Sequence, residues 1–137
     1  MKNLALIICS LLLMVSCNSK QTNTDYKNKL NANWSLERIN GEILKEGMTV
    51  PNLNLDIKSM RVSGNSGCNS FNGSIIEINS EHIDLGDLAT TLKLCPEPNY
   101  ESEFMTALKV MNSYSLDEDR LIISNATEQE LLVFSKQ

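Results

Sequence analysis

The sequence predicts an α+β domain, an antiparallel β-sheet with one amphipathic α-helix inserted before its last hairpin. Three observations predict this fold class. Residues 34–86 form short segments in which apolar and polar side chains alternate, as they do in half-buried strands. Residues 99–112 place apolar side chains at helical spacing instead. Strand-like segments then return at residues 121–123 and 131–134.

Residues 1–16 are predicted to be a lipoprotein signal peptide. A basic residue precedes an apolar run over residues 4–15, which is shorter than the roughly 20 residues of a membrane-spanning helix. Met14-Val15-Ser16-Cys17 resembles the bacterial lipobox, in which the cysteine sulfur receives a diacylglycerol before cleavage. We therefore expect Cys17 to be lipidated and to begin the mature chain, with plain secretion as the alternative. Cys9 would leave with the leader.

Residues 17–33 are predicted to be a lipidated, flexible tether. Nearly all of their side chains are polar, with Tyr26 and Leu30 as the large apolar exceptions, and such a composition cannot bury a core. Two or three acyl chains hold a protein stably on a bilayer, whereas a single chain holds it only marginally. Asn18 follows the lipobox cysteine, and by the common sorting rule this favours the periplasmic face of the outer membrane.

Residues 34–137 are predicted to fold as one domain that opens with a hairpin. Trp34 and Leu36 alternate with polar residues before Asn40-Gly41, a strong two-residue hairpin signal. Further strands are predicted at residues 53–57, 60–63, 74–78 and 82–85. Residues 34–86 should therefore be entirely β.

One segment interrupts this pattern and is predicted to be the helix, residues 99–112. Two prolines at 96 and 98 stop whatever precedes it, and Phe104, Leu108 and Met111 then recur at helical spacing. Acidic residues near its start favour the positive end of the helix dipole. The predicted core comprises Trp34, Leu36, Leu55, Val62, Phe71, Ile76, Ile78, Ile83, Leu85, Leu88, Phe104, Leu108, Leu121, Ile123 and Phe134.

The charge balance limits the kinds of partner. The chain has 17 acidic and 12 basic side chains, a formal net charge of −5, and no basic stripe. Phosphate backbones and anionic lipid surfaces attract basic proteins. We therefore expect no nucleic-acid partner, and a membrane contact only through the lipid anchor.

A cluster of glycines and asparagines at residues 64–73 predicts a shaped loop, because these residues favour positive φ and hydrogen bonds from side chain to backbone. The cluster, the segment Leu88–Cys95 and the segment Glu103–Leu108 together resemble the META domain family, which includes the HslJ-like envelope lipoproteins. The resemblance covers roughly residues 33–135. Its motif residues here are Gly64, Gly67, Cys68, Asn69 and Gly73.

The resemblance implies a curved antiparallel β-sheet packed around one amphipathic α-helix. Members of the family are mostly small proteins of the cell envelope, sometimes linked to stress or antibiotic tolerance. No enzymatic activity is established for the family, so the resemblance implies a fold more than a function.

Cys68 and Cys95 are the two cysteines of the predicted domain. An even pair outside the cytoplasm suggests a disulfide. Two unlinked thiols and a redox-active pair stay open as alternatives, because the sequence does not say whether the two Cα atoms lie within about 7 Å. The chain lacks the Cys-x-x-Cys spacing that lowers a thiol pKa.

Neither a metal, a cofactor nor a catalytic group is expected. Zinc needs three or four close ligands, and the chain offers two distant cysteines and the single His82, which we expect to be an exposed strand residue. A nucleophilic pair of Cys68 with His82 would lack an orienting partner. The acidic run 117–119 lacks the ligand spacing of a calcium loop and predicts a solvated turn.

Two functional hypotheses follow. The leading one is a non-catalytic, membrane-anchored lipoprotein of the cell envelope that acts as an interaction or stress-tolerance module, with an unidentified envelope protein as partner. The alternative is a module that binds a small ligand or a peptide, using the concave side of the sheet or the Asn-rich loop around Asn65, Asn69 and Asn72.

Overall fold

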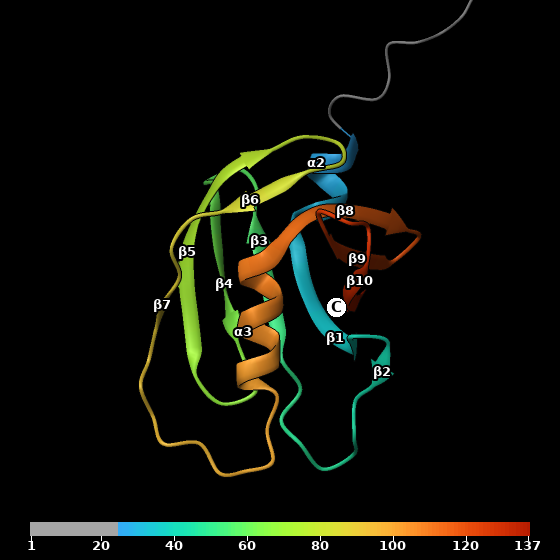
Figure 1. The fold of residues 1–137 in the computed structure, drawn as a ribbon. Coiled ribbons are helices and arrows are strands. Elements are labelled where there is room, and N and C mark those ends of the chain that lie inside the picture. Colours follow the sequence, from blue (N-terminus) through green and yellow to red (C-terminus); the bar gives the residue numbers. More distant parts are fainter. Residues whose placement is uncertain (1–24) are drawn as a thin grey trace, which may run out of the picture.

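The computed structural model describes residues 25–137 (Figure 1). The predicted signal peptide, Cys17, Asn18 and the first part of the predicted tether lie outside the described residues. From Asp25 to the C-terminus, no helix is both long and apolar enough to cross a bilayer.

A single antiparallel sheet dominates the fold. Its strands follow one another in the order β6-β5-β4-β3-β1-β10-β9-β8, with β2 added beside β1 and β7 beside β5. The strands are β1 (Ala32–Ile39), β2 (Glu42–Ile43), β3 (Asn52–Asp56), β4 (Arg61–Asn65), β5 (Ser70–Ile78), β6 (Ile83–Leu85), β7 (Ala89–Thr90), β8 (Met111–Asp117), β9 (Arg120–Asn125) and β10 (Glu130–Lys136).

The two outermost strands, β6 and β8, approach each other and almost close the sheet into a barrel (Figure 1). His82 and Ser113 form an isolated antiparallel bridge. Next to it, the backbone amide of Tyr114 donates to the carbonyl of Glu81 over 2.8 Å, and the Tyr114 hydroxyl donates to the carbonyl of Asn79 over 2.6 Å. The fold is therefore more β-dominant than the predicted α+β arrangement, a nearly closed barrel-like curve with a small helical part.

The predicted amphipathic helix is present as α3 (Glu101–Val110) and lies on the concave side of the sheet (Figure 1). Phe104 is fully buried, with its ring centroid 5.9 Å from that of Phe71 and 6.2 Å from that of Phe134. Such tilted and edge-on aromatic pairs contribute beyond the apolar area that they bury. The helix is shorter than predicted because Met111 already has extended backbone angles and begins β8.

A second, short helix, α2 (Asp25–Leu30), was not predicted. Leu30 is fully buried, and its carbonyl accepts a hydrogen bond of 3.0 Å from the Trp34 indole. Tyr26 lies four residues earlier, on the same helical face, and also packs against the core. The predicted tether of residues 17–33 must therefore be corrected over residues 25–33. The sequence shows Tyr26 and Leu30 as apolar, but the polarity of their neighbours outweighed their helical spacing in the prediction.

Most of the predicted core is buried, with one clear exception. Ile76 is 61% exposed, and its neighbour Ile75 is buried instead. The pairing of β5 with β6 shifts register between Ile75 and Glu77, and such an irregularity changes which side chain faces inward. Ile78, Leu85 and Leu88 are only partly buried against the core. Buried residues that were not predicted include Leu30, Ile39, Leu53, Ile57, Tyr100, Tyr114 and Leu131–Val133.

Candidate functional site

The two ends of the barrel differ in how they are built. At one end, called the α2 end, lie α2, the turn 57–60 and the hairpin loop 79–82. At the other end, called the disulfide end, lie the loops 44–51, 66–69 and 91–99. The strand β5 runs from the disulfide end to the α2 end.

The glycine-rich cluster at the disulfide end is shorter than predicted as a loop, because β4 extends to Asn65 and β5 starts at Ser70. Gly67 adopts φ +99, which favours glycine in the remaining turn. Gly64 lies on a paired strand, where a Cβ would clash with the carbonyl oxygen of Asn52. A Cβ at Gly73 would likewise meet the Leu88 side chain at 2.7 Å. Close packing therefore requires glycine at both strand positions.

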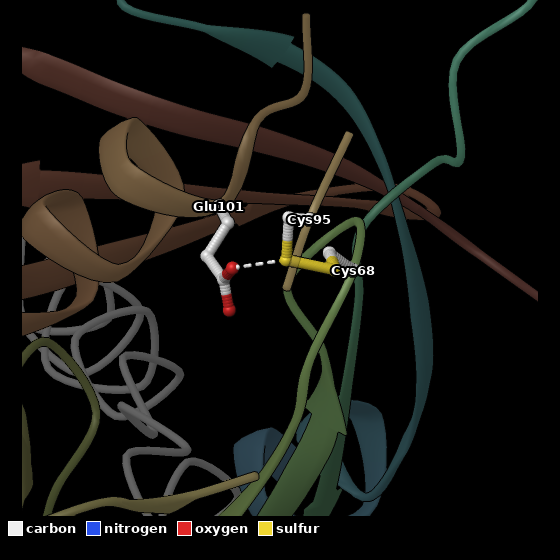
Figure 2. Close-up of side chains that lie close together, drawn as sticks. All are labelled: Cys68, Cys95 and Glu101. Carbon is white, nitrogen blue, oxygen red and sulfur yellow. Dashed lines mark hydrogen bonds between the residues drawn. A yellow bond between two sulfur atoms is a disulfide. The ribbon is translucent and has the colours of Figure 1, made fainter. Parts of the chain in front are cut away.

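Cys68 and Cys95 form a disulfide, with their Cα atoms 5.9 Å apart (Figure 2). The bond joins the turn after β4 to the segment that precedes α3. The predicted pairing is thus present, and it favours the disulfide over two unlinked thiols. Closing a loop between residues 27 apart restricts the unfolded chain and thereby stabilises the fold.

Asn69 connects the same segments through its side chain, which is 4% exposed. Its Oδ1 accepts hydrogen bonds from the Thr91 hydroxyl at 2.7 Å and the Lys93 amide at 2.8 Å. Its Nδ2 donates to the Lys93 carbonyl at 3.2 Å and to Glu101 Oε2 at 3.0 Å. A primary amide has two acceptor sites and two hydrogens, so these four bonds use its whole capacity. Asn69 therefore shapes the loop and has no group left for a ligand.

Glu101, the first residue of α3, points at the disulfide (Figure 2). One carboxylate oxygen lies 2.9 Å from the Ser66 hydroxyl, and the other lies 2.8 Å from Cys95 Sγ. A disulfide sulfur carries no hydrogen, so the contact with Cys95 is a close approach and not a hydrogen bond. Within the described part of the chain, Cys68, Cys95 and Glu101 are the one group of metal-ligating side chains whose ligand atoms all lie within 4.8 Å of one another.

Sequence reasoning missed Glu101. Its only signal was an acidic residue in the first helical turn, which was interpreted as a response to the helix dipole. Ser66, Cys68, Asn69, Cys95 and Glu101 are together called the disulfide cluster. Three separate segments contribute to it, and spacing along the chain does not reveal such a convergence.

A second feature of this end is the leucine loop, residues 91–95. Leu92 is 95% exposed and Leu94 is 100% exposed, although both belong to a constrained backbone. The Thr91 amide donates to the Ser70 carbonyl, Lys93 is held through both backbone groups by Asn69, and Cys95 is in the disulfide. The loop therefore exposes two large apolar side chains to solvent, while its backbone has little freedom to move.

Several clefts lie around the domain. One of about 430 Å³ at the disulfide end is lined by residues that include Met48, Cys68 and Pro96. Another of about 770 Å³ lies between the segment 84–88 and α3, with Leu88 and Met105 in its lining. Both volumes fall within the range of about 300–1,000 Å³ that is typical of ligand pockets. The concave side of the sheet, by contrast, is filled by α3 and its aromatic contacts.

The remaining predicted residues lie elsewhere. His82 is exposed at the α2 end, its Nδ1 3.3 Å from the Asn112 carbonyl, so the length of β5 separates it from Cys68. The acidic run 117–119 is exposed around a turn, as predicted.

Two side chains have shifted pKa values. Burial raises the pKa of Tyr114 at the barrel seam, whereas hydrogen bonds from Ser59 lower the pKa of Asp56.

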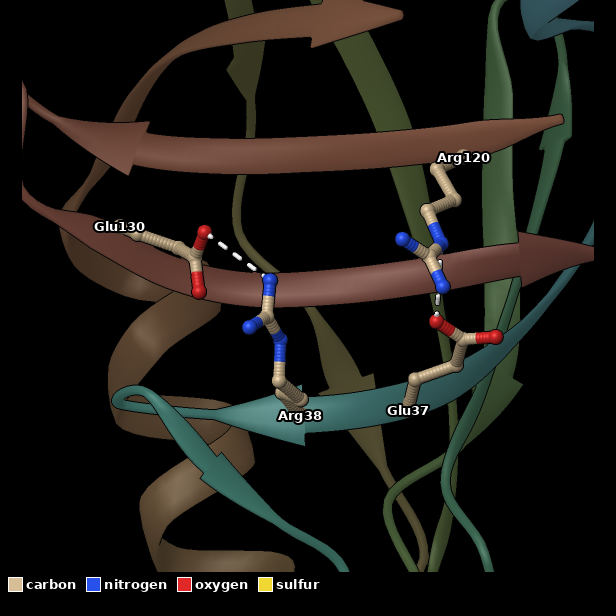
Figure 3. Close-up of polar contacts among 4 residues, drawn as sticks. All are labelled: Glu37, Arg38, Arg120 and Glu130. Carbon is tan, nitrogen blue, oxygen red and sulfur yellow. Dashed lines mark hydrogen bonds and ion pairs between the residues drawn. The ribbon is translucent and has the colours of Figure 1, made fainter. Parts of the chain in front are cut away.

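The outer face of the sheet carries two cross-strand ion pairs (Figure 3). A register shift in β1 between Leu36 and Arg38 lets the adjacent residues Glu37 and Arg38 both reach outward. Arg120 Nε lies 3.3 Å from Glu37, and Arg38 lies 3.5 Å from Glu130. Exposed pairs of this kind contribute about 0–1 kcal/mol each, so they are surface features and not a site.

Comparisons with known proteins agree with the geometry of the fold. The family model described as META domain matches residues 16–137. Two solved structures, both determined by NMR, are similar in fold. One is 23% identical, with a TM-score of 0.60, and the match covers 78% of this chain and 90% of that protein. The other, from Burkholderia xenovorans, is 20% identical, with a TM-score of 0.61 and coverage of 85% and 89%. No curated protein matches the chain.

Proposed function

Because the chain belongs to the META domain family, we propose that it is a non-catalytic interaction module of the bacterial cell envelope, held at the membrane by a lipid on Cys17. In this proposal the module sits on the periplasmic face of the outer membrane and contributes to tolerance of envelope stress. The disulfide end is the surface that meets the partner.

The observation that carries the proposal is the leucine loop. A pair of leucines at 95% and 100% exposure gains nothing for the stability of the isolated domain. Their backbone is nevertheless held by a disulfide and by a side-chain amide with no spare hydrogen bond. A surface that is rigid before binding loses less conformational entropy on association. Such a loop is suited to inserting Leu92 and Leu94 into a partner.

The partner is proposed to be an envelope protein with an apolar pocket and an acidic rim. Lys93 lies between the two leucines, so a rim of opposite charge would complement it. A second site on an anionic lipid surface is less favourable, because the chain has a net charge of −5.

A site-specific crosslink tests the interaction. A photoreactive phenylalanine analogue is placed at Leu94 in the full-length protein and activated in intact cells. We expect one discrete product with an envelope protein, reduced at least about tenfold by Leu92→Ser, as a central apolar contact of about 1.4 kcal/mol or more would require. The matched control carries the analogue at Ile43, which is 78% exposed, and should give no such product. Equal products at both positions, or none at Leu94, would refute the proposal.

Intact-mass measurement tests the anchor separately. We expect a mature chain that starts at Cys17 and carries the mass of two or three acyl chains. Cys17→Ala should leave the leader uncleaved and the protein without acyl mass. An unmodified chain that retains residues 1–16 would contradict the envelope location.

The alternative function, binding of a small ligand or peptide, is supported only in a narrower form. Asn69 has no free hydrogen-bonding capacity and α3 fills the concave side, so neither is favoured as a binding surface. Asn65 and Asn72 lie on β4 and β5 and do not belong to a loop. In this alternative, the small ligand or peptide would bind in the cleft of about 770 Å³ beside α3. Chemical-shift changes confined to Met105 and Leu88 on addition of a ligand library would support it over the leucine loop.

A further inference from the structure

We propose that the disulfide cluster becomes a metal site when the disulfide is reduced. In the dithiol state, Cys68, Cys95 and Glu101 would bind a thiophilic divalent cation of the zinc class through two thiolates and one carboxylate. This inference goes beyond the proposed interaction function and does not depend on it.

The geometry of three side chains carries the proposal. The two Cys Sγ atoms and a carboxylate oxygen of Glu101 already lie within 4.8 Å of one another. A tetrahedral zinc ion with Zn–S bonds of about 2.3 Å holds two thiolate sulfurs about 3.8 Å apart. Once the covalent bond is gone, rotation of the two cysteine side chains opens this separation while the backbones stay 5.9 Å apart. Solvent can supply the fourth ligand.

The surroundings of the three ligands resemble the outer shell of a metal site. The Ser66 hydroxyl lies 2.9 Å from Glu101 Oε1 and orients the carboxylate. Asn69 Nδ2 donates to Glu101 Oε2 over 3.0 Å and lies 3.3 Å from Cys95 Sγ, so it contacts two of the three ligands. Outer-shell hydrogen bonds of this kind fix ligand orientation and affect metal affinity strongly.

Charge gives a physical reason for a cation in the reduced state. Two thiolates and a carboxylate, all partly buried, would bring three negative charges together. Buried charges are costly unless they are paired or coordinate a metal. The cleft of about 430 Å³ that Cys68 lines provides an entry path for both the reductant and the ion.

The redox step is a two-electron exchange. A dithiol reductant breaks the bond between Cys68 and Cys95, transfers two electrons and two protons, and becomes a disulfide itself. The metal ion then replaces the two thiol protons, which pass to solvent. Reoxidation of the cysteines would release the ion, so metal binding and the disulfide exclude each other.

Cobalt(II) titration of the full-length protein in detergent tests the proposal. The protein is reduced with a dithiol, the reductant is removed without oxygen, and cobalt(II) is added as a spectroscopic probe. We expect thiolate-to-cobalt charge-transfer absorption at one ion per chain in the reduced protein and none in the oxidised protein. Glu101→Gln should weaken binding by about tenfold or more. The matched control Glu103→Gln alters an exposed carboxylate in the same helical turn and should bind like wild type.

Nuclear magnetic resonance spectra of the reduced protein complete the test. If reduction loosens the domain, cobalt(II) should restore the native spectrum, because binding energy then appears as folding energy. Absence of the charge-transfer band overturns the proposal, whether the reduced protein is folded or not. Equal affinity of wild type and Glu101→Gln would overturn the assignment of Glu101 as a ligand.

Discussion

The α2 end and the disulfide end of the barrel are held in different ways. At the α2 end, apolar burial and backbone hydrogen bonds close the structure, with Leu30 and Tyr114 buried beside the seam. At the disulfide end, the loops are joined by a covalent bond and by the side chains of Asn69 and Glu101. Leu92 and Leu94 face solvent there.

The comparison shows where a small domain can present a surface for binding. An end closed by its own core has little apolar area to offer a partner. An end held by a disulfide and a satisfied amide can leave leucines exposed and still keep its shape. The structure thus separates the part that stabilises the domain from the part that is available for contact.

The largest expected effect on stability comes from a substitution in α3, the helix inside the barrel. Phe104→Ala removes the buried ring between Phe71 and Phe134 and should lower the free energy of unfolding by about 4 kcal/mol. Chemical denaturation measures it. The control Val110→Ala, on the same helix but 49% exposed, should change stability far less. Equal midpoints for wild type and Phe104→Ala would show that the helix does not fill the barrel.

Removal of the disulfide should have the second-largest effect on stability, and the loosening should be concentrated at the disulfide end. Replacing both Cys68 and Cys95 with serine should cost about 3.5 kcal/mol, as expected for opening a loop between residues 27 apart. Hydrogen exchange should speed up at Lys93, whose amide donates to Asn69, before it speeds up at Tyr114. Uniform acceleration over both ends would contradict the division into two differently held regions.

The converse variant is Leu30→Ala, which acts at the α2 end. Removing a fully buried side chain should cost about 3 kcal/mol and accelerate exchange there, while the leucine loop keeps its protection. Lys29→Ala on the same helix is the control, since its ion pair with Asp25 is exposed. A stability equal to that of wild type would return residues 25–33 to the tether that the sequence predicts.

The smallest effect concerns Tyr114 and depends on pH. Tyr114→Phe loses the hydrogen bond to the Asn79 carbonyl and should cost about 1 kcal/mol at neutral pH. Burial raises the pKa of Tyr114 above its ordinary value of 10.0, so the native state keeps its proton when the unfolded chain loses it. Wild type should therefore lose stability as the pH rises above 10.0, and the variant should lose less. Parallel pH curves for the two proteins would rule out this linkage.

Local patterns accounted for most of the strands, the amphipathic helix and half of the buried apolar side chains, whereas β7 and β8 were not predicted. Helical spacing identified Phe104 and Leu108 as core residues, and alternation identified Leu55 and Val62. Both patterns depend only on a few neighbouring residues. The prediction that Ile76 is buried was wrong because an irregularity in strand pairing is set by the partner strand β6. Leu30 was missed because its burial depends on Trp34 and the barrel around it.

The sequence by itself determined the META family membership, most of the antiparallel strands, the position of α3 and the likeness of residues 14–17 to a lipobox. Tertiary structure alone decided the near closure of the barrel, the ordering of α2 and the convergence of Glu101, Asn69 and the two cysteines. The physical reason is range. Strand and helix periods arise from backbone geometry between near neighbours, whereas a closed seam or a cluster of ligands requires the chain to bring distant residues together.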